Sequence, residues 1–87
     1  MTESHNPVMA RDLEINTVAD GYVLYQPDQD RVHYLNQTAA LVFELCNGRN
    51  PEADLPRLVQ LAFGLPQLPV SEVAECLESL RREGLIA

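Results

Sequence analysis

The chain has 87 residues, of which 46% are apolar and 22% are charged, and this length fits one domain with a modest core and no deep catalytic cavity beside it. With 13 acidic and 6 basic side chains the net charge is −7, and no basic stripe suits the chain to nucleic acid. No apolar run approaches the roughly 18 residues of a membrane helix. The N-terminus lacks the features of a secretory signal, so we expect a cytoplasmic protein.

Residues 1–11 are polar, contain Pro7 and show no period, which predicts a flexible N-terminal arm, with a single domain over residues 12–87. The domain begins with a first strand, in which apolar residues of 13–17 alternate with polar ones. Asp20-Gly21 predicts a type I′ hairpin turn into a second strand over 22–25. Pro27 and the three polar residues after it predict another turn, and a third strand over 31–35 follows.

After residue 35 the apolar positions take helical spacing. Asn36 is a suitable N-cap for a first helix, with a stripe from Ala39 to Cys46, and we expect this helix to end at Asn47-Gly48. Asn50-Pro51 predicts the start of a second helix, as N-cap and first helical residue.

The second helix has an alternative start, because Pro56 also suits a regular helix that begins nearer Asp54. Its apolar stripe runs from Leu55 to Phe63, and Gly64 ends it.

A third helix is predicted after the connector of residues 65–69. Ser71 is its expected cap, Val73, Leu77 and Leu80 form its apolar stripe, and Gly84 ends it so that Leu85-Ile86 can fold back onto the core. The fold class is therefore α+β, a winged helix-turn-helix-like arrangement with a three-stranded antiparallel sheet followed by three helices (βββααα).

The cysteines, Cys46 and Cys76, lie beside apolar helix positions without CxxC spacing, and His5 and His33 add no ligand pattern. We therefore expect free thiols, no metal and no cofactor. The sequence also brings no nucleophile, base and orienting group together, which predicts that the protein is not an enzyme. The carboxylate pairs of the third helix are expected to be a solvated helix face.

An ordered set of short motifs runs from Val32 to Gly48: a strand into Leu35-Asn36, Thr38-Ala39 at a helix start, Phe43-Glu44-Leu45, and Asn47-Gly48. Together with a last helix that ends in Gly-Leu-Ile, this order resembles the PqqD-like family over residues 13–87. The resemblance implies a peptide chaperone (RiPP recognition element) that binds the leader segment of a ribosomally synthesised precursor peptide. The leader adds as a strand to the third strand and rests against the third helix, while a separate enzyme, often a radical SAM protein, modifies the peptide.

Carried onto this chain, the resemblance implies a receiving edge and a helix wall. The edge residues are Arg31, Val32, His33, Tyr34 and Leu35. The wall is expected on the flank of the third helix that holds Glu72, Cys76, Ser79 and Glu83, together with Leu80 of the neighbouring apolar stripe, and the other flank holds Ala74, Glu78 and Arg81. Small residues at the centre of the first flank and acids at its ends suit a peptide with an apolar anchor and a basic residue.

Other interpretations stay open. His33 also fits a structural histidine, and Tyr34 also fits cross-strand packing. An accessory subunit that docks on a larger enzyme without peptide cargo would need the same exposed edge. A winged-helix DNA-binding regulator is disfavoured, because Glu72–Glu83 carries four acids against Arg81 and Arg82. We expect no nucleic-acid or membrane partner and a monomer or weak homodimer.

Overall fold

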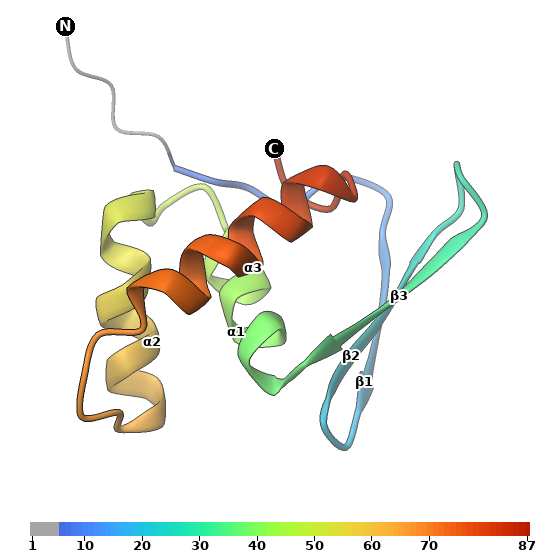
Figure 1. The fold of residues 1–87 in the computed structure, drawn as a ribbon. Helices are drawn as coiled ribbons and strands as arrows, with labels where there is room; N and C mark the ends of the chain where they lie inside the picture. Colours follow the sequence, from blue (N-terminus) through green and yellow to red (C-terminus); the bar gives the residue numbers. More distant parts are fainter. Residues whose placement is uncertain (1–5) are drawn as a thin grey trace, which may run out of the picture.

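The computed structural model describes residues 6–87. Within these residues three strands, β1 (Glu14–Val18), β2 (Gly21–Gln26) and β3 (Arg31–Asn36), precede three α-helices, α1 (Gln37–Leu45), α2 (Leu55–Phe63) and α3 (Val70–Arg82). The strands are antiparallel (Figure 1), so the predicted α+β order of three strands and three helices is confirmed.

The sheet has the order β1-β2-β3, which leaves β3 as an edge strand. The loop from β1 to β2 is Ala19-Asp20, and neither residue has a positive φ, so the predicted type I′ turn at Asp20-Gly21 is wrong. Gly21 lies inside β2 with a φ of 150°, where a Cβ would stand 1.9 Å from the carbonyl oxygen of Leu35. Glycine is therefore required by the close approach of β3 and not by the turn.

Three of the predicted helix boundaries hold, and one of them is Gly64, which is the left-handed C-cap of α2. The Asn36 side chain accepts a hydrogen bond from the Ala39 amide at 2.9 Å, which confirms it as the N-cap of α1. Gly84 follows α3 with its N–H donating to the Arg81 carbonyl, and the Leu85 N–H donates to the Leu80 carbonyl at 2.8 Å. This pair of bonds is a Schellman closure, and it turns Leu85 and Ile86 into the core.

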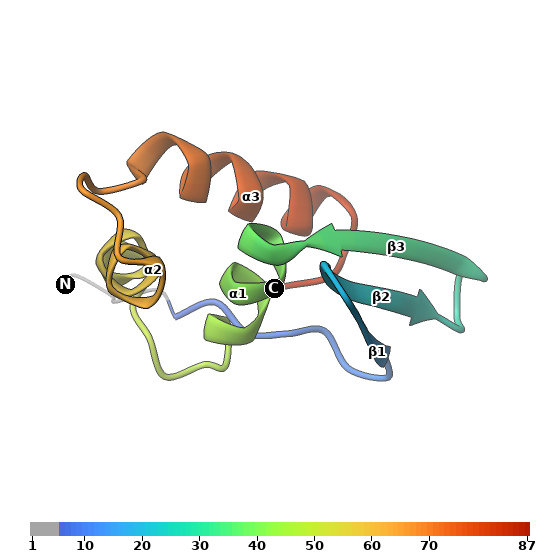
Figure 2. The ribbon, with the colours of Figure 1, turned by 90° about the horizontal axis from the view of Figure 1, so that it is seen from below.

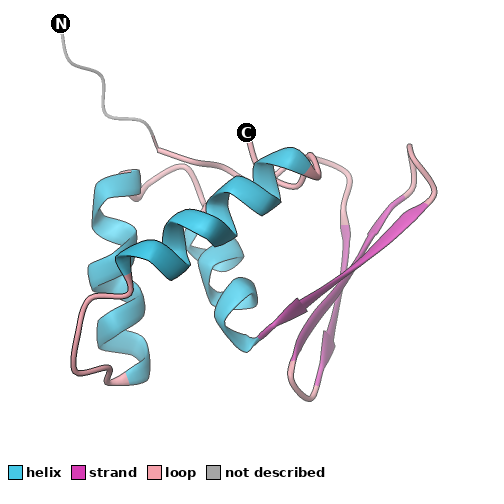
Figure 3. Ribbon diagram, viewed as in Figure 1, coloured by secondary structure: helices cyan, strands magenta, loops and turns pink. Residues whose placement is uncertain are grey.

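Loops and turns separate the helices and strands (Figure 3), and other helix boundaries differ from the predictions. Helix α1 ends at Leu45 with Cys46 as its C-cap, before Gly48 is reached. Asn50 caps no helix, because its side-chain amide donates to the Leu45 carbonyl, and α2 begins after Asp54, the later of the two starts considered. A short 3₁₀ turn, Glu52–Asp54, fills the interval.

Ser71 is not the cap of α3. The helix begins one residue earlier, at Val70, and its N-cap position is Pro69, which has no side chain able to accept a hydrogen bond. The Val73 N–H donates to the Pro69 carbonyl at 3.0 Å. The first turn of α3 is therefore capped by a backbone carbonyl of the connector and not by a side chain.

Helix α1 lies at the centre of the molecule, with α2 on one side, the sheet on the other and α3 across it (Figure 1). Val42, Phe43 and Cys46 are fully buried there. Among the described helices, α1 is the one with Cα atoms within 8 Å of β2 and β3, and α3 has none that close to β3. The space between β3 and α3 is therefore not closed by backbone packing.

Residues 6–10 pack on the body of the protein, where the sequence predicts a loose arm. The Met9 N–H donates to the Cys46 carbonyl and the Ala10 N–H to the Leu85 carbonyl, both at 2.8 Å. The Gly48 and Ala87 amides donate back to residues 7 and 8. This segment, here called the N-terminal strap (residues 6–10), joins the end of α1 to the C-terminal tail, while residues 1–5 of the predicted arm lie outside the described part.

Candidate functional site

A groove of about 510 Å³ lies between the second half of β3, the first turn of α1 and α3. A second hollow of about 360 Å³ runs from there to the start of β3 and the end of α3. The two hollows share Tyr34, Leu35, Ser79 and Leu80. They therefore form one depression along β3, which we call the β3–α3 groove.

Strand and helix run alongside the groove in opposite directions (Figure 2). The end of β3 faces the first half of α3, at Glu72, Glu75 and Cys76. The start of β3, at Arg31, faces Glu83. The groove thus has two chemically different ends.

The backbone of β3 presents free groups along this edge. A two-residue hairpin closes on the hydrogen-bonded pair of Val18 and Gly21, and such pairs alternate along an antiparallel ladder. Every second residue of β2, beginning with Tyr22, therefore directs its N–H and C=O groups toward β3. Their partners in β3 are Arg31, His33 and Leu35. The N–H and C=O groups of Val32 and Tyr34 consequently point away from the sheet, where an added strand would meet them.

The side chains of β3 divide between two environments. His33 and Leu35 share the face that packs toward the helices, opposite Leu24 and Tyr22, and Leu35 is buried. Val32 and Tyr34 lie on the outer face, where they are 66% and 58% exposed. Tyr34 also lines the rim of the groove.

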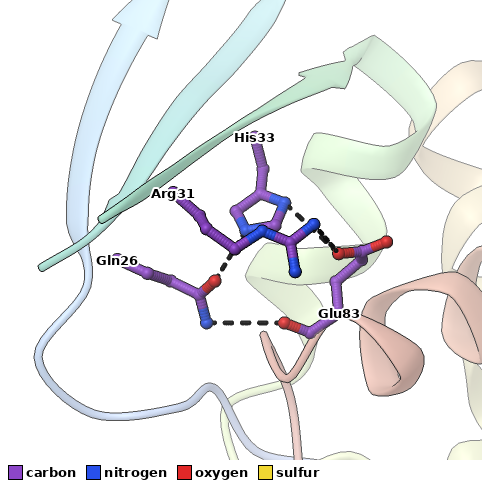
Figure 4. Close-up of polar contacts among 4 residues, drawn as sticks. All are labelled: Gln26, Arg31, His33 and Glu83. Carbon is purple, nitrogen blue, oxygen red and sulfur yellow. Dashed lines mark hydrogen bonds and ion pairs between the residues drawn. The ribbon is translucent and has the colours of Figure 1, made fainter. Parts of the chain in front are cut away.

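The Arg31 end of the groove is closed by a polar network (Figure 4). Arg31 Nη2 donates to Glu83 Oε1 at 3.0 Å, which joins the start of β3 to the end of α3. His33 Nε2 donates to Gln26 Oε1 at 2.7 Å, and Gln26 Nε2 donates to the Glu83 carbonyl at 3.4 Å. His33 is therefore held in the network as a structural side chain, and its Nδ1 lies 3.9 Å from Glu83 Oε1.

The Asn36 end of the groove is open and acidic. Glu72 and Glu75 line it, and within residues 6–87 neither carboxylate forms an ion pair. Burial raises the pKa of the Cys76 thiol between them, and the charges of Glu75 and Glu72 raise it further.

The structure brings together all ten residues that the resemblance singles out. Arg31, Val32, His33, Tyr34, Leu35, Ser79, Leu80 and Glu83 line the hollow at the start of β3, and Glu72 and Cys76 line the other half. The flank of α3 with small residues at its centre is thus the one that faces β3. Their role in peptide binding remains a prediction.

Sequence reasoning missed five groove residues: Asn36, Thr38, Ala39, Glu75 and Leu85. The first three form the floor, because α1 begins directly at the end of β3 without a loop. Glu75 lies one helical turn after Glu72, and this i,i+3 spacing was the signal that could have placed it on the same flank.

The described residues contain neither a metal-binding cluster nor a membrane-spanning helix. No three His, Cys, Asp or Glu side chains of residues 6–87 gather closely enough to hold a metal ion, and His5 lies outside that range. Both cysteines are free thiols, as predicted. No helix in the described part is long and apolar enough to cross a bilayer.

Comparison with known proteins adds the family. A family model described as coenzyme PQQ synthesis protein D (PqqD) matches residues 21–86. No curated protein and no solved structure matches the chain. The match leaves out β1 and includes β3, α1 and α3, the three elements that form the groove. Because it covers more than half of the chain, the chain belongs to the PqqD family of accessory proteins in coenzyme PQQ and related peptide-modification pathways.

Proposed function

We propose that this protein binds the leader segment of a ribosomally synthesised precursor peptide and presents it to a modifying enzyme, such as a radical SAM protein. The observation that carries the proposal is the free edge of β3, whose residues line the β3–α3 groove. The leader would add as a fourth strand, and the ten edge and wall residues would contact it.

The groove supports strand addition on physical grounds. Neighbouring strands lie about 4.8 Å apart, and no Cα atom of α3 lies within 8 Å of a Cα atom of β3 to obstruct a fourth strand. The outward N–H and C=O groups of Val32 and Tyr34 would supply hydrogen bonds that do not depend on leader sequence. Leu35, Leu80 and the small side chains of Cys76 and Ser79 would supply a shallow apolar pocket that does.

In this proposal the protein supplies binding and the partner enzyme supplies chemistry. In the polar network at Arg31, His33 and Glu83, the side chains pair with one another and hold β3 to the end of α3. Burial raises the pKa of the Cys46 thiol to about 11, while Arg81 lowers it and Glu52 raises it. A thiol with such a pKa is a poor nucleophile at neutral pH.

A winged-helix regulator would use α3 as its recognition helix. The exposed groove flank of α3 carries Glu72 and Glu75 without cationic partners in the described chain. Phosphate groups would be repelled there, so DNA binding is disfavoured on the structure as well as on composition.

The proposal is tested by an NMR titration of the isotope-labelled full-length protein with a leader peptide encoded beside its gene. We expect the largest amide shifts on β3 and on the groove flank of α3. Val32→Pro removes an outward amide of β3 and should weaken binding at least tenfold. Thr17→Pro is the matched control, because it removes an outward amide from the opposite edge strand, β1.

Two results would count against strand addition. One is a titration in which β3 stays silent while shifts concentrate on α2 or on the N-terminal strap. The other is an equal loss of affinity in Val32→Pro and Thr17→Pro. A neighbouring gene for a short precursor peptide would also favour leader binding over a cargo-free accessory subunit.

A further inference from the structure

A third hollow, of about 240 Å³, lies beyond the end of β3, between the starts of α1 and α3 and the end of α2. Phe63, Leu65 and Pro69 form its apolar wall. It shares Thr38 and Glu72 with the β3–α3 groove. A chain that leaves the groove past Asn36 therefore passes directly over Glu72 into this hollow, here called the α2–α3 hollow.

The α2–α3 hollow exposes apolar surface that the fold does not use. Phe63 belongs to the stripe of α2 that the sequence predicts to be buried, yet it is 40% exposed. Leu65, which lines the same hollow, is also exposed, and the nearby Leu68 and Val70 are exposed outside its lining. Exposed apolar side chains that gather around a hollow are a common feature of binding surfaces.

The two ends of the β3–α3 groove differ in whether their carboxylates are paired with a cation. At the Arg31 end, Glu83 is neutralised by the guanidinium at 3.0 Å. At the other end, Glu72 and Glu75 have no ion-pair partner within residues 6–87. The strongest attraction for a cation therefore lies where the groove meets the α2–α3 hollow.

We propose that the bound peptide continues past the end of β3, places a lysine or arginine between Glu72 and Glu75, and then places an apolar side chain in the α2–α3 hollow. This inference rests on the proposed function, because it extends the path of the same peptide. From the end of β3 outward, the peptide would meet Glu75, then Glu72 and then Phe63. Its basic residue would therefore lie nearer the β-paired segment than its apolar residue.

The test is a selection from a displayed library of random twelve-residue peptides on four full-length proteins: wild type, the double variant Glu72→Lys/Glu75→Lys, Phe63→Ser and Glu78→Lys. The last is the matched control, since Glu78 lies on α3 outside the groove and carries the same charge. Wild type and Glu78→Lys should enrich a basic residue beside the β-pairing segment and an apolar residue on its far side, before it in the peptide if the strand adds antiparallel to β3 and after it if the strand adds parallel. The double variant should enrich an acidic residue at that position, and Phe63→Ser should keep the basic preference and lose the apolar one.

The best peptide is then measured by calorimetry at low salt. Exchanging its basic residue for glutamine should weaken binding to wild type about two- to fivefold, the range of an exposed ion pair, and should not weaken binding to the double variant. Enriched peptides that shift β3 amides but show no basic preference, or the same preference on the double variant, would overturn this inference and leave the proposed function standing. If no enriched peptide shifts the β3 amides, both fail together.

Discussion

Gly21 shows how one residue sets the approach of two strands. Its φ of 150° is unfavourable for a side chain, and an added Cβ would meet the Leu35 carbonyl at 1.9 Å. We expect Gly21→Ala to lower the free energy of unfolding by about 3 kcal/mol or more, as overpacking and backbone strain combine. Gly64→Ala is the control, because φ is 63° there with nothing within 4 Å, and it should cost about 1–2 kcal/mol. Urea denaturation measures both, and equal losses would refute the steric explanation.

Cys46 makes a pH-dependent contribution to stability. It is fully buried, and its Sγ donates to the Val42 carbonyl at 3.2 Å. Burial raises the pKa of the Cys46 thiol to about 11, with Arg81 opposing and Glu52 adding to the shift. An unfolded thiol ionises near a pKa of about 8.5, so this stabilisation is complete below pH 8.5 and is lost as the pH rises toward 11.

The corresponding measurements are alkylation and unfolding. Iodoacetamide at pH 8 should modify the half-buried Cys76 well before Cys46 in the folded protein, as read by peptide mass spectrometry. Between pH 8.5 and 10.5 the unfolding free energy of wild type should fall more steeply than that of Cys46→Ala. Equal labelling rates, or parallel pH profiles, would show that the Cys46 thiol is not protected by burial.

At the scale of elements, the β3–α3 groove depends on a helix and a strand whose backbones stay apart, since no Cα atom of α3 lies within 8 Å of a Cα atom of β3. Ser79 lies where its two hollows join, and Ala74 is exposed on the opposite flank of α3. Ser79→Phe should fill the groove and weaken leader binding at least tenfold in calorimetry, while the unfolding free energy stays within about 0.5 kcal/mol. Ala74→Phe adds the same ring outside the groove and should leave affinity unchanged. Equal affinities of the two variants would place the peptide elsewhere.

Across the whole molecule, the N-terminal strap holds the two halves of the chain together. Residues 7–10 take part in four backbone hydrogen bonds, two with the end of α1 and two with the C-terminal tail. At roughly 0.5–1.5 kcal/mol each, their removal should lower the unfolding free energy by about 2–6 kcal/mol. The comparison is a chain beginning at Arg11 against one beginning at Asn6, both melted in urea. Identical midpoints would show that the strap contributes nothing.

Much of the fold and part of the candidate site follow from short-range patterns. Period-two and helical spacings predict the six elements in order, and Asn36 and Gly84 are found as cap and terminator because both roles depend on neighbours within four residues. The first flank of α3 faces β3 in the structure, and its four residues share one side of a helical wheel. The elements, the two caps and the grouping of these four residues on one flank need only local geometry, so the amino-acid order alone determines them.

Tertiary structure decided the features that depend on distant segments. Gly21 is required by β3 and not by its own turn, and Phe63 is left exposed because α2 buries only Leu55 and Val59 fully. The strap docks because the amides at the end of α1 and in the tail need partners that no local pattern supplies. Thr38 and Glu75 join the groove for the same reason: which surfaces face each other is set by how α1 and α3 pack, and this packing is a property of the assembled core.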